Sequence, residues 1–130
     1  MRESPDGFSD QRLMVNNILC LSERGNTSYY MAVGLLEHYP SFRAPAVRSA
    51  GTRTVEALIP VTQRLVDWAD LIVLATPETE RFLNALPLDL LPPTVMLNLP
   101  ERSNVLDVRS VKSVTTQKVD KILRKGVDGL

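Results

Sequence analysis

The chain has 130 residues, 44% of them hydrophobic, which suffices for the core of one domain. It carries 15 Lys and Arg against 15 Asp and Glu, so no net charge attracts it to nucleic acid or an anionic membrane. No run approaches the roughly 18 apolar residues of a membrane span, and residues 1–12 are polar rather than signal-like. We expect a cytoplasmic protein that binds neither nucleic acid nor membrane.

The chain contains one cysteine, Cys20, and one histidine, His38. An intramolecular disulfide is therefore excluded, and a metal site with nitrogen and sulfur ligands from one chain is not expected. We expect no metal and no cofactor. Catalytic mechanisms that require two or three cysteines are also excluded.

In chain order, residues 1–15 are polar and lack any hydrophobic period, which predicts a flexible N-terminal extension before a domain over residues 16–130. Residues 18–21 are continuously apolar and are followed by turn residues, as in a buried parallel strand. Residues 29–39 carry apolar side chains at helical spacing and stop before a proline, which predicts the first helix. Its apolar stripe comprises Met31, Ala32, Leu35, Leu36 and Tyr39.

The same reasoning predicts three further strands and three further helices. The strands are residues 46–50, 71–75 and 95–99, and the helices are residues 60–69, 77–85 and 113–125. Residues 86–93 contain three prolines and predict an irregular connection. Regular alternation of strand and helix is typical of an α/β fold, a three-layer open sheet of four parallel strands flanked by helices.

Ligands in open α/β sheets bind beyond the carboxyl ends of the strands. Four segments should meet there: residues 22–28, 51–53, 76 and 100–107. The first follows a predicted strand, contains a glycine and leads into a helix, so its backbone N–H groups and the helix dipole should form an anion-binding cup. We expect phosphate, sulfate or a phosphorylated group to bind there. The cup residues are Ser22, Glu23, Arg24, Gly25, Asn26, Thr27 and Ser28.

Two stretches resemble the low-molecular-weight protein tyrosine phosphatase superfamily, especially its compact bacterial branch. They are Arg48-Ser49-Ala50-Gly51-Thr52 and Val61-Thr62-Gln63-Arg64-Leu65-Val66-Asp67-Trp68-Ala69-Asp70-Leu71-Ile72. The resemblance extends over residues 17–111. It implies strand order 2-1-3-4 and a phosphate loop in which a Cys nucleophile and an Arg are separated by five residues, with an Asp on a late loop as general acid.

On this resemblance Ser22 stands at the position of the nucleophilic Cys and Ser28 at the position of the Arg. Asp107 stands at the general-acid position, although the proline that usually follows is Val108 here. A serine hydroxyl needs a base to become a nucleophile, and His38 is ten residues beyond Ser28, about 15 Å along the helix. Without the Arg, a phosphoryl group also lacks its bidentate partner.

The sequence leaves the roles of several residues open. Cys20 is either an inert core residue or a displaced nucleophile. Glu23 and Arg24 either form a solvated pair or contact a ligand, and Asp107 is either a cap residue or a remnant acid. Tyr29 and Tyr30 either pack at the helix start or have a role in recognition or as sites of modification. Ser22 is not explained as a single engineered replacement of a nucleophilic Cys, because position 28 would then still be basic.

The leading hypothesis is a phosphatase-like protein that has lost catalysis, a pseudophosphatase, and that binds an anion or another protein. One alternative is an active, divergent phosphomonoesterase that uses Cys20 or Ser22. The other is a structural interaction module whose loop is empty. The sequence does not determine the oligomeric state.

Overall fold

The computed structural model describes residues 15–39, 45–99 and 107–125. Four parallel strands form one sheet in the order β2-β1-β3-β4, which confirms the predicted fold class and strand order. The strands are β1 (Asn17–Ser22), β2 (Ala46–Gly51), β3 (Leu71–Leu74) and β4 (Thr94–Met96). The helices are α1 (Asn26–His38), α2 (Gln63–Trp68), α3 (Pro77–Asn84) and α4 (Val108–Lys125).

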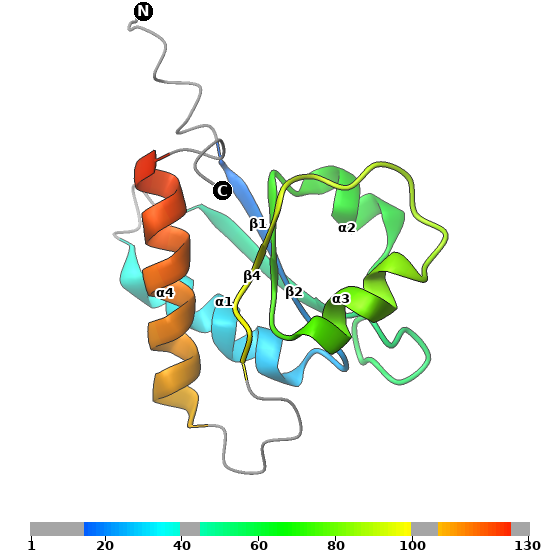
Figure 1. The fold of residues 1–130 in the computed structure, drawn as a ribbon, viewed down its shortest axis with the longest axis horizontal. Coiled ribbons are helices and arrows are strands. Elements are labelled where there is room, and N and C mark those ends of the chain that lie inside the picture. Colours follow the sequence, from blue (N-terminus) through cyan, green and yellow to red (C-terminus); the bar gives the residue numbers. More distant parts are fainter. Residues whose placement is uncertain (1–14, 40–44, 100–106, 126–130) are drawn as a thin grey trace, which may run out of the picture.

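The helices form a layer on each side of the sheet. Helices α1 and α4 pack together on one face, and α2 and α3 cover the other (Figure 1). Gly34 allows the close approach of α1 to α4, because a Cβ at this position would lie 2.9 Å from Lys112 Cβ. The result is the three-layer arrangement that the alternation of strands and helices predicts.

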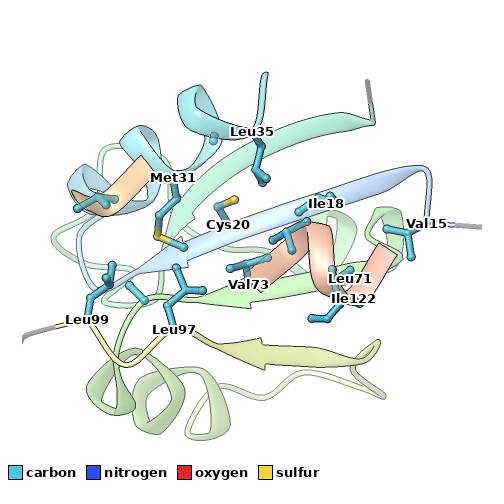
Figure 2. Packing of buried hydrophobic residues seen from close by; sticks show 14 residues of the cluster. Val15, Ile18, Cys20, Met31, Leu35, Leu71, Val73, Leu97, Leu99 and Ile122 are labelled. Atoms are coloured by element: carbon cyan, nitrogen blue, oxygen red, sulfur yellow. The ribbon is translucent and has the colours of Figure 1, made fainter. Parts of the chain in front are cut away.

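The central strand β1 divides the core in two. Its side chains alternate between the faces, so Ile18 and Cys20 pack under α1 and α4 while Leu19 and Leu21 pack under α2 and α3. All four side chains are fully buried. Figure 2 shows the cluster under α1 and α4, where Cys20 lies among aliphatic side chains. Such continuous burial explains why residues 18–21 lack the polar alternation of a half-exposed strand.

Two helices begin earlier than predicted. Helix α1 begins at Asn26 rather than at residue 29, because Gly25 is its N-cap with φ 95° and leaves the strand by a turn of only three residues. Helix α4 begins at Val108 rather than at residue 113, and Val111 is already buried. The predicted apolar stripe of α1 is wrong at Leu36, whose side chain is 50% exposed.

Two other boundaries also differ from prediction. Helix α2 begins at Gln63 because the Thr62 hydroxyl accepts the Leu65 N–H, whereas Pro60 pairs with Gly51 at the edge of the sheet. Strand β4 ends at Met96 because Asn98 has φ 57°, which interrupts the extended backbone.

The predicted N-terminal extension mostly lies outside the described residues, which begin at Val15. Val15 itself is 8% exposed and belongs to the core under α1 and α4.

Candidate functional site

The predicted cup lies where β1 turns into α1, at the carboxyl edge of the sheet. Ser22 ends β1, residues 23–25 bend, and Asn26 begins α1. The left-handed conformation of Gly25 reverses the chain and lets the Tyr29 N–H donate to the Gly25 carbonyl at 3.2 Å. The N–H groups of Asn26 and Thr27 belong to the first turn of α1, where no intrahelical carbonyl can accept them. The chain therefore forms a strand-turn-helix in which the N–H groups of Asn26 and Thr27 have no acceptor within the helix.

The Ser22 hydroxyl lies at the centre of this turn and is itself surrounded by donors. The N–H groups of Gly25 and Ser28 donate to Ser22 Oγ at 3.1 and 3.0 Å. Ser22 is 5% exposed. Two of the amides predicted to face an anion thus converge on one oxygen atom, and in this structure that oxygen belongs to the protein.

Ser28 completes a chain of hydroxyl groups. Ser22 Oγ donates to Ser28 Oγ at 3.0 Å, and Ser28 Oγ is 3.1 Å from both the Gly25 and the Ala50 carbonyl oxygens. Ser28 is fully buried. The proton of Ser22 is therefore directed at a second hydroxyl whose own proton is directed at backbone carbonyls. No group in this chain of donors has the basicity to remove a proton from a serine.

The charged residues of the cup bind a neighbouring loop rather than each other. Arg24 Nε donates to Glu56 Oε1 at 2.8 Å, Arg53 Nη2 lies 2.7 Å from Glu56 Oε2, and Arg53 Nη1 lies 3.6 Å from Glu23 Oε1. Of the two interpretations of Glu23 and Arg24, the solvated pair is wrong, because two ion pairs instead join residues 22–28 to residues 52–59.

The backbone brings these two segments together. The N–H groups of Thr52 and Arg53 donate to the Ser22 and Glu23 carbonyls at 2.9 and 2.7 Å. Gly51 permits the approach, because a Cβ there would lie 2.8 Å from the Arg24 carbonyl carbon and 2.5 Å from the Ala57 Cβ. The predicted meeting of residues 22–28 with residues 51–53 is present in these contacts.

Sequence reasoning missed two residues of this region, Arg53 and Glu56. The prediction placed residues 51–53 at the site but assigned Arg53 no role, because a charged loop residue has no periodic signal that reveals its partner. The hydroxyl of Thr52 was expected, from its residue type, to make a structural capping or loop hydrogen bond, and the described part of the structure does not show one. Thr52 is 1% exposed, and its Oγ1 has no hydrogen-bond partner among residues 15–39, 45–99 and 107–125.

Cys20 is an inert core residue in this structure, as the first of its two interpretations requires. It is fully buried on β1, and this burial raises the pKa of its thiol far above the usual value. A thiolate is the nucleophilic form of cysteine, so an apolar environment that suppresses it also suppresses reactivity. Cys20 lies two residues before the turn and faces the α1 and α4 layer, among the side chains drawn in Figure 2.

Asp107 caps α4. Its Oδ1 accepts the Arg109 N–H at 3.2 Å, its carbonyl accepts the Val111 N–H at 3.0 Å, and the Ser110 hydroxyl is 3.4 Å from Oδ2. No hydrogen bond or ion pair joins Asp107 to the cup in the described part of the chain. The preceding residues 100–106, which were also expected at this edge, lie outside the described residues.

The remaining polar candidates lie apart from the cup or at its edge. Thr76 caps α3 by accepting the Thr79 N–H at 3.1 Å. His38 ends α1 and lies 3.8 Å from Asp120 on α4. Tyr29 and Tyr30 are 56% and 40% exposed and stack edge to face on each other. His38 is twelve residues beyond the first residue of α1, so it lies at the far end of the helix from Ser22. It cannot act as a base for Ser22.

Within the described ranges, no helix is long and apolar enough to cross a membrane. The same residues contain no group of three or more His, Cys, Asp or Glu side chains that could hold a metal ion.

No model of a known protein family matches the sequence, and comparison with curated proteins gives no match. Solved structures do match the fold. One is a low molecular weight protein tyrosine phosphatase from Bacillus subtilis, with a TM-score of 0.50 and 15% identity over 83% of this chain and 92% of that one. Another is Vibrio vulnificus Wzb in complex with benzylphosphonate, with a TM-score of 0.51 and 15% identity over 89% of this chain and 99% of that one. With the strand order, the layers and the turn between β1 and α1 already described, this likeness assigns the chain the fold of the low molecular weight protein tyrosine phosphatases.

Proposed function

We propose that this protein is a phosphatase-like binding protein without phosphatase activity, a pseudophosphatase, whose turn between β1 and α1 binds phosphate or a phosphorylated group. The observation that carries the proposal is the hydrogen-bond chain from Ser22 through Ser28 to backbone carbonyls. This hydrogen-bond chain keeps the Ser22 hydroxyl protonated at the position where low-molecular-weight tyrosine phosphatases have the nucleophilic cysteine. Ser28, in turn, supplies no positive charge for a transferring phosphoryl group.

The binding half of the proposal rests on the backbone of the turn. The N–H groups of Gly25 and Ser28 already converge on an oxygen atom, and those of Asn26 and Thr27 have no intrahelical acceptor. The positive end of the α1 dipole lies at the same place. These features suit an oxyanion and require neither a nucleophile nor a general acid.

The loss of catalysis is tested by hydrolysis of p-nitrophenyl phosphate. The purified protein and its Ser22→Ala variant should both release no nitrophenol above buffer. Equal turnover that persists in a Cys20→Ser variant as well would indicate a contaminating enzyme and would leave the proposal standing, whereas equal turnover that is lost in Cys20→Ser would favour a phosphomonoesterase that uses Cys20. Turnover that survives purification in the unmodified protein and vanishes in Ser22→Ala would overturn it and would favour the divergent phosphomonoesterase.

Anion binding is tested by thermal unfolding with and without millimolar phosphate or phosphotyrosine. A ligand present at ~100 times its Kd stabilises the folded protein by about 2.7 kcal/mol. Chloride at equal ionic strength is the control for general salt effects. A melting temperature that phosphate and chloride change equally would remove the binding half of the proposal.

A second candidate is an interaction module whose turn holds no ligand, because Ser22 and Ser28 already satisfy two of its amides. The exposed loop after β2 favours this candidate, since Val55 and Leu58 are 99% and 94% exposed. Apolar side chains exposed together are typical of contact surfaces. Under this candidate, phosphate has no effect on unfolding, and Val55→Ser with Leu58→Ser weakens binding of a protein partner without changing the fold.

A further inference from the structure

Two arginine side chains converge on the carboxylate of Glu56. Arg24 Nε is 2.8 Å from Oε1, and Arg53 Nη2 is 2.7 Å from Oε2, so each oxygen of the carboxylate is bound by a different guanidinium group. Two guanidinium groups that share one oxyanion form the arrangement by which proteins bind phosphates and carboxylates. In this structure the bound oxyanion is a side chain of the protein.

Both arginines are attached to the cup. Arg24 belongs to the turn between β1 and α1, and the backbone N–H of Arg53 donates to the Glu23 carbonyl of the same turn at 2.7 Å. The guanidinium group of Arg53 also lies over the Phe82 ring, 5.1 Å from its centroid. The position of Arg53 is therefore fixed by a hydrogen bond and a stacking contact that do not involve Glu56.

We propose that Arg24 and Arg53 bind the oxyanion of a phosphate monoester, and that Glu56 occupies their donors in the free protein as an internal competitor. The inference rests on the proposed function, because it names the side chains that hold the ligand at the same turn. The two arginines supply the positive charge that Ser28 lacks. Their combined charge matches the double negative charge of a phosphate monoester.

Glu56 is suited to be displaced. Its side chain is 39% exposed, and the loop that carries it leaves Val55, Leu58 and Ile59 exposed to solvent. Ion pairs at this degree of exposure contribute little to stability, so a ligand that replaces Glu56 gives up little of the folding free energy. The second carboxylate of the region, Glu23, lies 3.6 Å from Arg53 Nη1, and Arg24 pairs with Glu56.

The test compares inorganic phosphate binding to the wild type, to Glu56→Gln and to Glu37→Gln by isothermal titration calorimetry. Glu37→Gln is the matched control, because it makes the same change of charge at an ion pair with Lys112 on the α1 and α4 side. Glu56→Gln should lower the Kd for phosphate about tenfold. This factor corresponds to about 1.4 kcal/mol, which is of the order of the free energy of two partly exposed ion pairs. Adding Arg24→Gln and Arg53→Gln to Glu56→Gln should abolish the gain.

Each result separates the inference from the proposed function. Tighter binding by Glu56→Gln than by the wild type, with no such gain in Glu37→Gln, supports the inference. Phosphate binding that is equal in the wild type and Glu56→Gln overturns the inference and leaves the proposed function intact. An equal gain in phosphate affinity in Glu37→Gln overturns the inference, because the gain would then come from the change in net charge. Absence of binding in the wild type and in Glu56→Gln overturns both, provided that circular dichroism shows both proteins folded.

Discussion

Replacement of Ser22 by Ala should destabilise the protein through the hydrogen bonds of the turn rather than through lost packing. The change removes the acceptor of two backbone N–H groups and the donor to Ser28 Oγ. Ser28 is fully buried, so its N–H has no solvent to replace the lost oxygen, whereas Gly25 is only partly buried. A buried donor left unpaired costs about 1–3 kcal/mol, and we expect a total loss of about 2–3 kcal/mol of unfolding free energy.

Urea denaturation at 25 °C, followed by circular dichroism, measures this loss. For a chain of this length each kcal/mol corresponds to about 3–4 °C, so the melting temperature should fall by roughly 6–12 °C. Ser49→Ala on β2 is the matched control, because Ser49 is half-buried and its hydroxyl has no hydrogen bond within the described residues. The control should change the free energy by less than about 0.5 kcal/mol.

A loss in Ser22→Ala no larger than that in Ser49→Ala would refute the reasoning, because the turn would then not depend on the Ser22 hydroxyl. A second measurement links the same variant to binding. Ser22→Ala frees the N–H group of Gly25, which is only partly buried, so phosphate should raise its melting temperature by more than it raises that of the wild type. An equal rise would mean that an anion does not use this amide.

Three further predictions follow from burial and close contact. Cys20 should react with a thiol reagent such as dithionitrobenzoate only after denaturation, and rapid labelling of the folded protein would contradict its burial. Gly51→Ala should cost about 1–3 kcal/mol in urea denaturation, because the added Cβ meets Ala57 Cβ at 2.5 Å, and a neutral result would contradict the close packing of the two loops. Burial, assisted by the charge of Asp120, raises the pKa of Tyr39 to about 12. The unfolded phenol titrates near pH 10, so stability falls from about pH 10 to 12, and this part of the fall should be missing in Tyr39→Phe.

The sequence alone determined the order of the elements, the class of the sheet and the place of the cup. Runs such as residues 18–21 and 71–74 are apolar at every position because the sheet is covered on both faces, and this signal is local. The resemblance supplied the strand order, which local patterns do not contain. Element boundaries were less accurate where a cap decides them, as with Gly25 before α1 and Thr62 before α2.

Only the tertiary structure decided what the polar residues of the site do. The sequence placed Ser22 and Ser28 at the nucleophile and arginine positions, but their mutual hydrogen bond depends on how the turn folds back onto α1. The partner of Arg24 is Glu56, 32 residues later, which no spacing rule predicts. Side chains in loops choose partners by position in space, and a sequence pattern records only position along the chain. That is why the fold could be predicted while the contacts of the turn between β1 and α1 could not.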